Sequence, residues 1–280
     1  MLVKEVRKVS SEPTIMYGTA WKKDDTARLV KLAIKSGFTA IDTANQKKHY
    51  DEVLVGEALN EAFKSGAKRE SFFIQTKFTS KDGQDHRLPY DPKADLKTQV
   101  RQSIDSSLEH LHTDYIDSYV LHGPHYRQGL SKEDWQVWQG IEEQFEAGKT
   151  KMVGCSNVSA DQLRELATVA KVKPRMVQNR CYAMTGWDYE VRQICKEIGA
   201  TYQGFSLLTA NPQVLNHPFV MQIAQRQNAT PAQVIFKFSM SVGMLPLTGT
   251  TSEKHMLEDL KAKEIELSQE EIDSIEKISF

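Results

Sequence analysis

The chain has 280 residues, of which 40% are hydrophobic, so it can bury a large core in one or two domains. Its 36 basic and 37 acidic residues give a formal net charge of -1, so no overall field would direct it to nucleic acid or to an anionic membrane.

No apolar run approaches the ~20 residues that span a bilayer, and the N-terminal stretch MLVKEVRKVSSEP lacks the apolar core of a secretory signal. Cys155, Cys181 and Cys195 are odd in number and lack CxxC spacing, which fits a reducing compartment better than a disulfide framework or a zinc site. We therefore expect a cytoplasmic enzyme or binding protein.

Short β-rich runs alternate with amphipathic stretches of helical period along the whole chain, which is typical of parallel βαβ units. Several of the helical stretches end in glycine, where a left-handed C-terminal cap is expected. The pattern predicts an α/β fold, a single-domain (β/α)8 TIM barrel over residues 1–280. The alternative is an open doubly wound sheet, but the segment 17–25, YGTAWKKDD, lacks the GxGxxG turn that such sheets normally carry. The eight β-rich runs are residues 14–20, 38–44, 71–78, 115–123, 151–157, 175–181, 200–208 and 243–250.

Two segments exceed a minimal barrel. Residues 79–95 are long, polar and rich in turn residues, and we expect them to form a loop over the C-terminal mouth that shapes a substrate pocket. Two helical patterns, HPFVMQIAQRQNA and PAQVIFKFSMSV, lie between the last two runs, where one would suffice. Pro231 suits the first position of a helix, and we interpret this insertion as structural.

Polar side chains stand at the predicted C-terminal ends of the strands, where (β/α)8 barrels place their catalytic groups. Asp42, Lys77 and His122 end three successive runs, so an acid, an amine and an imidazole would converge at one mouth. The later runs carry Ser156, Asn157, Gln178, Phe205, Ser206 and the segment 248–251 at or near their ends.

Each of these residues also has an ordinary structural interpretation. Asp42 suits a turn, Lys77 would be solvated, and His122 would be a hydrogen-bonded histidine of the rim. Tyr50 would begin a helix. Their conjunction favours a functional site, because burying Asp and Lys without a partner costs several kcal/mol.

A tyrosine beside these groups indicates proton transfer by a phenol. A Lys ammonium within ~4 to 6 Å of a phenol lowers its pKa of about 10 by about one to three units. We therefore expect Lys77, held by Asp42, to lower the pKa of Tyr50, and His122 to hydrogen-bond a substrate oxygen. A proton donated to a carbonyl oxygen requires hydride at the carbon, which no side chain supplies, so a nicotinamide cofactor is implied.

With these residues the sequence resembles the aldo-keto reductase superfamily over nearly its whole length. The segments that carry the resemblance are GFTAIDTA with HYDEVLVGEAL, FFIQTKF, SLEHLHTDYIDSYVLHGP, GKTKMVGCSN and KPRMVQN. The resemblance implies NADP-dependent reduction of aldehydes or ketones to alcohols, with Asp42, Tyr50, Lys77 and His122 as the catalytic tetrad. The segment DTANQKKHYDE and the loop after Lys77 resemble the fungal members most.

The resemblance also implies contacts to the nicotinamide and to the substrate. Ser156, Asn157 and Gln178 would hydrogen-bond the carboxamide, and Phe205 would stack on the ring. Trp21 would line the substrate pocket. The other cofactor contacts that it implies are Gly18, Thr19, Ser206, Leu208, Thr250, Thr251, Lys254, His255, Glu258 and Asp259, the last two at the adenine.

The chain departs from the common family pattern in the loop that carries the tyrosine. That tyrosine usually lies five residues after the aspartate, where this chain has Lys47. Tyr50 lies three residues further along than Lys47 and therefore requires a longer loop, but it is the only tyrosine in the segment 42–52.

A second departure concerns the 2′-phosphate of the cofactor. Many members have a lysine and an arginine where this chain has Gly249 and His255. The segment 250–252 would still offer hydroxyl and backbone N–H donors at a helix N-terminus, or Thr250 and Glu253 would form an ordinary capping box. NADP(H) is the expected cofactor, with NAD(H) or dual use as the alternative.

Other patterns give weaker indications. His110, His112, His122 and His125 have HxH and HxxH spacings that do not converge on one ion, so we expect no metal. The expected partner is a small carbonyl compound, without nucleic acid or membrane, and nothing sets the oligomeric state. The alternative function is a redox-sensing module that binds the nucleotide without turnover.

Overall fold

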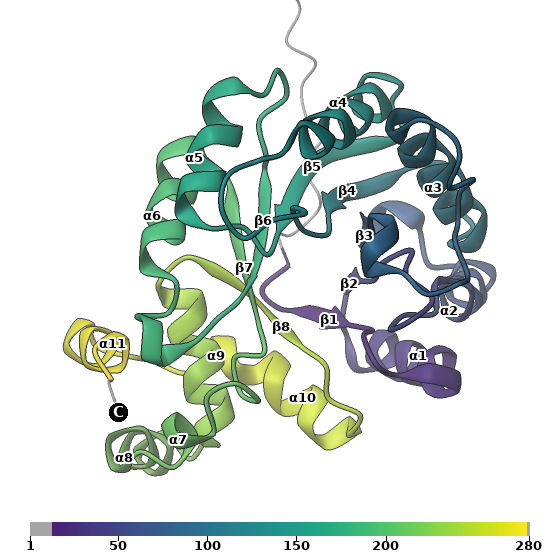
Figure 1. The fold of residues 1–280 in the computed structure, drawn as a ribbon. Helices are drawn as coiled ribbons and strands as arrows, with labels where there is room; N and C mark the ends of the chain where they lie inside the picture. The colour runs from purple at the N-terminus through teal and green to yellow at the C-terminus, as the bar shows by residue number, and fades with distance from the viewer. Residues whose placement is uncertain (1–12, 279–280) are drawn as a thin grey trace, which may run out of the picture.

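The computed structural model describes residues 13–278. Our expectation that residues 1–13 contain no secretory signal therefore falls almost wholly outside the described residues. Eight parallel strands form a closed barrel in sequence order (Figure 1). Each predicted β-rich run holds one strand, with the fifth strand starting one residue before its run, so the single-domain barrel is confirmed and the open sheet is wrong. The strands are β1 (Met16–Gly18), β2 (Ala40–Asp42), β3 (Phe73–Phe78), β4 (Ile116–Leu121), β5 (Thr150–Ser156), β6 (Met176–Arg180), β7 (Thr201–Phe205) and β8 (Met244–Thr248).

Helices surround these strands, as the view along the barrel shows (Figure 1). Their apolar faces pack on the outside of the barrel and make the larger hydrophobic core. The helices are α1 (Thr26–Ser36), α2 (Glu52–Lys64), α3 (Leu96–His110), α4 (Lys132–Glu146), α5 (Ala160–Val169), α6 (Tyr189–Ile198), α7 (Pro212–Leu215), α8 (Pro218–Arg226), α9 (Pro231–Ser241), α10 (Glu253–Lys261) and α11 (Gln269–Glu276).

Several helix ends follow directly from the sequence. α1 ends at Gly37 and α6 at Gly199, both in the left-handed conformation, as the glycine positions predict. α9 begins at Pro231, and Thr230 and Gln233 form a capping box at its start. Local sequence therefore sets where these helices begin and end.

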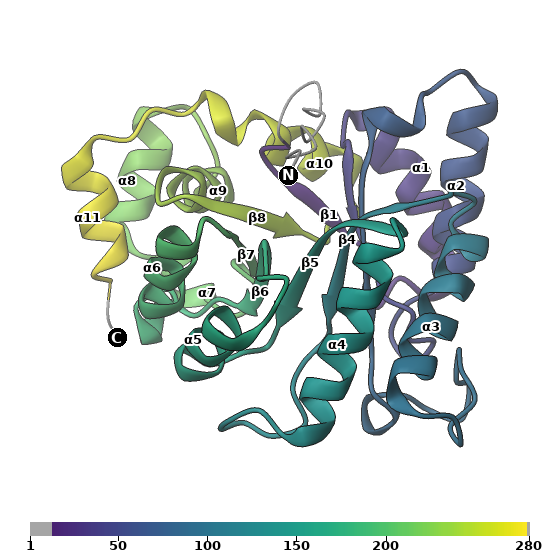
Figure 2. The same ribbon diagram turned by 90° about the horizontal axis from the view of Figure 1, so that it is seen from above.

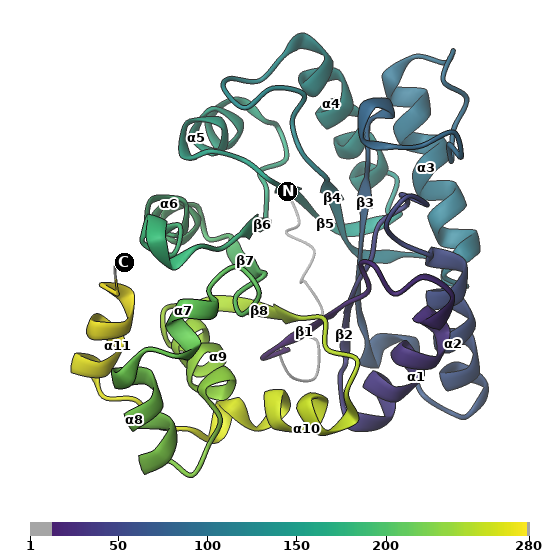
Figure 3. The same ribbon diagram turned by 60° about the horizontal axis from the view of Figure 1, so that its bottom comes forward.

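The region between β7 and β8 holds three helices, of which α7 is a single turn. α8 and α11 are the outermost helices, on the far side of α9 from the strands (Figure 3). α10 lies beside α1, where the last helix of the ring meets the first (Figure 2). No helix within residues 13–278 is long and apolar enough to cross a membrane.

The interior of the barrel is layered. Side chains alternate along a strand, so Phe73, Gln75 and Lys77 share one face of β3. Apolar residues of the small inner cluster, including Phe73 and Met176, fill the N-terminal layer. The next layer toward the C-terminal mouth is polar and buried, with Gln75 and Lys77 both 0% exposed. This polar layer is the floor of the candidate site.

Candidate active site

The floor of the site is an ion pair between neighbouring strands. Lys77 on β3 donates to both carboxylate oxygens of Asp42 on β2, at 2.7 and 2.8 Å, and to the carbonyl of Thr43 at 2.8 Å. The three ammonium protons therefore all have acceptors. Burial lowers the pKa of Lys77, and the Asp42 carboxylate opposes that shift.

Two glutamines that we did not anticipate complete this polar layer. The side-chain amide of Gln75 donates to Asp42 Oδ1 at 2.8 Å and to Gln203 Oε1 at 2.7 Å. Gln178 donates to the same two oxygens, both at 3.0 Å. Asp42 Oδ1 thus accepts hydrogen bonds from Gln75, Gln178 and Lys77, which fix the orientation of the carboxylate. Gln75 and Gln203 are polar residues in the middle of predicted strands, and this was the signal available in the sequence.

Tyr50 reaches the mouth of the barrel from the loop after β2. Its backbone N–H donates to the carbonyl of Gln46 at 3.0 Å, which closes a helical turn within the inserted segment NQKKH. Asp51 follows directly as the N-cap of α2 and accepts from the backbone N–H of Leu54. Tyr50 therefore both precedes the helix and faces the site, so its two interpretations are compatible.

The pKa that we expected for Tyr50 is wrong in direction. Burial, and then the Asp42 carboxylate, raise the pKa of Tyr50 above its usual range. The Lys77 ammonium lies 5.2 Å from the centre of the phenol ring, and among residues 13–278 no hydrogen bond joins it to the hydroxyl. The three protons of the Lys77 ammonium are all donated in hydrogen bonds to Asp42 and Thr43. The effect of burial on the pKa of Tyr50 therefore outweighs the effect of the ammonium charge. The phenol therefore stays protonated at neutral pH, which suits a proton donor.

His122 faces Tyr50 across the mouth. The two ring centres are 5.9 Å apart with an angle of 69° between the ring planes. Burial lowers the pKa of His122 to about 3, and the Lys77 charge adds to the shift. His122 Nδ1 lies 2.6 Å from the hydroxyl oxygen of Thr79. The imidazole is therefore neutral at physiological pH.

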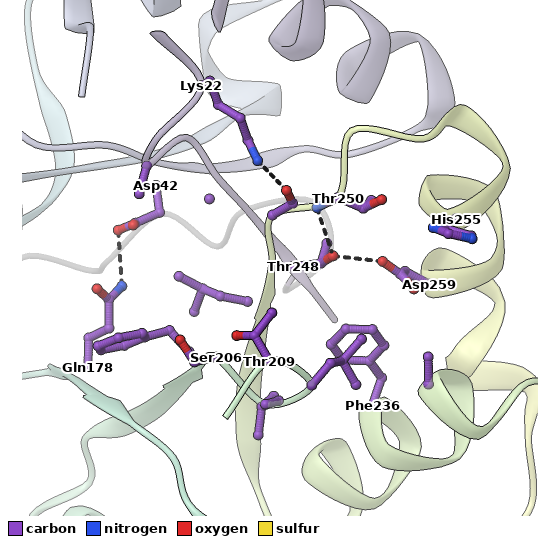
Figure 4. Close-up of a pocket in the computed structure, with 18 of the residues that line it drawn as sticks. Lys22, Asp42, Gln178, Ser206, Thr209, Phe236, Thr248, Thr250, His255 and Asp259 are labelled. Atoms are coloured by element: carbon purple, nitrogen blue, oxygen red, sulfur yellow. Dashed lines mark hydrogen bonds between the residues drawn. The ribbon is translucent and has the colours of Figure 1, made fainter. Parts of the chain in front are cut away.

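A cavity of about 520 Å³ runs from these two rings to α10. In Figure 4, Asp42 and Gln178 lie at one end, and His255 and Asp259 lie at the other. This volume is within the range of small-molecule and cofactor sites. Of the residues expected at the site, those that line the cavity are Gly18, Asp42, Tyr50, His122, Ser156, Asn157, Gln178, Phe205, Ser206, Leu208, Thr250, His255, Glu258 and Asp259.

Five expected residues lie outside the lining of the cavity. Thr19 is fully buried and donates its hydroxyl to the Asp42 carbonyl at 2.9 Å, and Lys77 lies beneath Asp42. Trp21 is 67% exposed, with its ring 4.0 Å from that of His49. Thr251 and Lys254 are exposed at the start of α10. Thr19 therefore has a structural contact where a cofactor contact was expected.

The cavity is also lined by residues that we did not expect. Lys22 donates a hydrogen bond from its ammonium to the Gly249 carbonyl, which joins the loops after β1 and β8 (Figure 4). Ala232 and Phe236 of α9 and its N-cap, Thr230, line the cavity, so our structural interpretation of this insertion is incomplete. No periodicity in the sequence could show that α9 approaches the cavity. The remaining residues are Ala20, Leu207, Thr209, Leu247 and Thr248.

The start of α10 differs from one of the two expectations. Ser252 is the N-cap and accepts from the backbone N–H of His255, so the capping box of Thr250 with Glu253 is wrong. The Thr250 hydroxyl accepts from the backbone N–H of Ser252 at 3.2 Å. Asp259 is 4% exposed and accepts from the Thr248 hydroxyl at 2.7 Å. Burial raises the pKa of Asp259 to about 6.

The comparisons with known proteins agree on one family. The model described as "Aldo/keto reductase family" matches residues 14–212. The glyoxal reductase of Bacillus subtilis (strain 168) is 29% identical over 258 residues, which cover 91% of this chain and 84% of that one. The protein REDOX 2 of Catharanthus roseus is 29% identical over 292 residues, which cover 95% and 85% of the two chains.

Solved structures give the same fold. The crystal structure of an aldo/keto reductase from Brucella melitensis matches with a TM-score of 0.79 at 25% identity, over 95% of this chain and 94% of that one. The crystal structure of a Bombyx mori aldo-keto reductase in complex with NADP matches with a TM-score of 0.79 at 21% identity, over 94% and 88% of the two chains.

Proposed function

The chain belongs to the aldo/keto reductase family, and on that premise we propose that it reduces aldehyde or ketone carbonyls to alcohols with NADP(H). The observation that carries the proposal is the pair of rings of Tyr50 and His122, 5.9 Å apart above the buried ion pair of Asp42 with Lys77. A protonated phenol and a neutral imidazole facing one cavity suit a single carbonyl oxygen.

Each member of the tetrad has a distinct role in this proposal. A nicotinamide cofactor bound in the cavity would supply hydride to the carbonyl carbon. Tyr50 donates its proton to the carbonyl oxygen, and His122 donates a hydrogen bond that places the same oxygen. The Lys77 ammonium, 5.2 Å from the phenol ring, stabilises the phenolate as it forms. Asp42 keeps that ammonium in place.

We place the nicotinamide at the end of the cavity that holds Asp42 and Gln178. The free hydrogen-bonding atoms at this end fit the carboxamide of a nicotinamide. Asn157 uses both amide protons within the protein, on the His122 carbonyl at 2.8 Å and on Ser156 Oγ at 3.1 Å. Gln178 uses both of its own on Asp42 and Gln203. Within residues 13–278 their amide oxygens accept no hydrogen bond and are left as acceptors at the cavity wall. A carboxamide NH₂ group offers the matching donors.

Within the chain, the support for NADP(H) comes from Lys22, His255 and the segment 250–252. Gly249 and His255 replace the lysine and arginine of the common pattern, and His255 lines the cavity. Lys22 brings an ammonium to Gly249 from the opposite loop. We propose that these groups, with the hydroxyl-rich segment 250–252, accept the 2′-phosphate. The NADP in the Bombyx mori structure supports the same cofactor.

Two finer assignments accompany the proposal. Cys155, Cys181 and Cys195 are all free and buried, which supports our expectation of a reducing, cytosolic compartment. The grouping with fungal members depends on the segment 42–52 and on the loop after Lys77, and it stays a prediction.

The proposal is tested by combining the protein, NADPH and a panel of aldehydes and ketones. We expect loss of the near-ultraviolet absorbance of NADPH with at least one class of carbonyl and formation of the matching alcohol. If NADPH binds by fluorescence titration but no carbonyl is reduced, the redox-sensing module becomes the better description. If NADPH does not bind, both functions are wrong.

A further inference from the structure

The loop after β3 places a hydroxyl directly on His122. Thr79, the first residue after β3, is 5% exposed, and its Oγ1 lies 2.6 Å from His122 Nδ1. Within residues 13–278 this ring nitrogen is the one hydrogen-bond partner of the Thr79 hydroxyl. The pair therefore determines which nitrogen of His122 carries the proton.

The proton count distinguishes the two neutral tautomers. If Nδ1 carried the proton, it would donate to the Thr79 oxygen, and the hydroxyl proton of Thr79 would have no acceptor in a buried place. If Thr79 donates to Nδ1, the hydrogen bond is satisfied and Nε2 carries the proton. The cost of leaving the Thr79 hydroxyl proton unpaired favours the tautomer with the proton on Nε2 by about tenfold or more. Protonation of both nitrogens is excluded near neutral pH, because burial and Lys77 lower the pKa of His122 to about 3.

We propose that Thr79 is a positioning residue that holds His122 in the tautomer with the proton on Nε2. This nitrogen then donates a hydrogen bond to the carbonyl oxygen of the substrate, while Tyr50 transfers its proton to the same oxygen. The inference rests on the proposed function for its effect on the rate. The tautomer itself does not depend on that function.

The surrounding loop fixes the side chain of Thr79. Gly83 approaches so closely that a Cβ there would lie 2.7 Å from Thr79 Cγ2, so the methyl group packs on Gly83 and the hydroxyl is directed to His122. The Thr79 carbonyl accepts from the Tyr90 hydroxyl at 2.9 Å and from the Gln84 side chain at 3.3 Å. Residues 79–95 thus orient a catalytic side chain, besides any contact with substrate.

The same loop is tied to the loop that carries Tyr50. Gln84 donates to the Asn45 carbonyl at 2.8 Å, and Gln46 donates to the Gly83 carbonyl at 2.6 Å. Thr79 is therefore anchored on both sides, and its hydroxyl is held toward the imidazole.

Nitrogen-15 NMR of the full-length protein tests the tautomer directly. The His122 resonances are assigned by comparison with His122→Gln. We expect a pyridine-like Nδ1 and a pyrrole-like, protonated Nε2 at neutral pH in the unsubstituted protein. A pyrrole-like Nδ1 in that spectrum overturns the inference.

Kinetics of substituted proteins give the second test. Thr79→Val should lower kcat about tenfold, with the dissociation constant of NADPH unchanged and the two tautomers mixed in the spectrum. Thr79→Ser should restore both. Thr150→Val is the matched control, because the Thr150 hydroxyl is also buried and bonded, to the Met152 carbonyl at 2.8 Å. It should leave kcat and the His122 spectrum unchanged.

The outcomes separate this inference from the proposed function. If Thr79→Val keeps both the wild-type kcat and the wild-type His122 spectrum, Thr79 has no positioning role, while carbonyl reduction by the unsubstituted protein stands. If the protein reduces no carbonyl but the spectrum shows protonated Nε2, the tautomer assignment stands and the proposed function fails.

Discussion

The Lys77 ammonium donates to both carboxylate oxygens of Asp42, at 2.7 and 2.8 Å, with side-chain exposures of 0% and 4%. Because both side chains are buried, water cannot solvate one charge when the other is removed. A buried pair is therefore far more sensitive to the loss of one partner than an exposed pair.

Asp42→Asn should lower the free energy of unfolding by about 3 to 5 kcal/mol, because it leaves the Lys77 charge buried and uncompensated. Urea denaturation measures the loss. The double variant Asp42→Asn with Lys77→Met removes both charges and should recover part of it. Glu146→Gln, which breaks an exposed pair with Lys171, should cost less than about 1 kcal/mol. Equal losses for Asp42→Asn and Glu146→Gln would mean that the buried pair has no special energetic role.

Asp259 should make stability depend on pH between about 4 and 6. Its pKa is raised from 3.8 to about 6 by burial, so the folded protein binds this proton more tightly than the unfolded chain. The stability from this group is complete below the unfolded pKa and is lost as the pH rises through about 6. Asp259→Asn should therefore match the wild type near pH 4 and exceed its free energy of unfolding by up to about 3 kcal/mol near pH 7.

Denaturant titrations of both proteins across this pH range measure the difference. The amide oxygen of the variant can still accept a hydrogen bond from the Thr248 hydroxyl, so both proteins keep this hydrogen bond. A constant difference between the two proteins at all pH values would show that Asp259 is not the titrating group.

The rate of carbonyl reduction should be nearly independent of pH between about 5 and 9. The pKa of Tyr50 is raised by burial and by Asp42, so its proton is present throughout this range. The pKa of His122 is lowered to about 3, so its ring is neutral throughout. The measurement is kcat with saturating NADPH and substrate at each pH. A step near neutral pH would indicate that the Lys77 charge lowers the pKa of Tyr50 and would contradict this prediction.

The cofactor preference is measured by titration with NADPH and NADH. We expect NADPH to bind more tightly. His255→Arg should tighten NADPH about tenfold, because a guanidinium can pair with the proposed 2′-phosphate through two parallel hydrogen bonds where the imidazole cannot, and should leave NADH unchanged. Lys254→Arg is the control, since the Lys254 side chain is 79% exposed and lies outside the cavity lining. Tighter binding of NADH by the wild type would overturn NADP(H) as the cofactor.

Much of the fold could be predicted from the sequence because its information is local. The β-rich runs, the glycines after α1 and α6, and Pro231 at the start of α9 each specify their own segment. The convergence of Asp42, Lys77 and His122 followed from a rule of the fold, since all three end neighbouring parallel strands.

The features that were missed depend on contacts between distant segments. The sequence gives no sign that the Thr43 carbonyl accepts the third hydrogen bond of the Lys77 ammonium. The direction of the shift in the Tyr50 pKa depends on that hydrogen bond. The approach of α9 to the cavity depends on how helices pack around the barrel. Gln75 and Gln203 are 128 positions apart and meet only when the barrel closes.

In the proposed function, Tyr50 donates the proton in carbonyl reduction. The most direct test is Tyr50→Phe, with Tyr189→Phe as a control because Tyr189 is 53% exposed and lies outside the cavity lining. We predict that Tyr50→Phe lowers kcat by about 10² to 10⁴-fold and changes the dissociation constant of NADPH by less than about twofold. Turnover by Tyr50→Phe equal to that of the Tyr189→Phe control would contradict the claim.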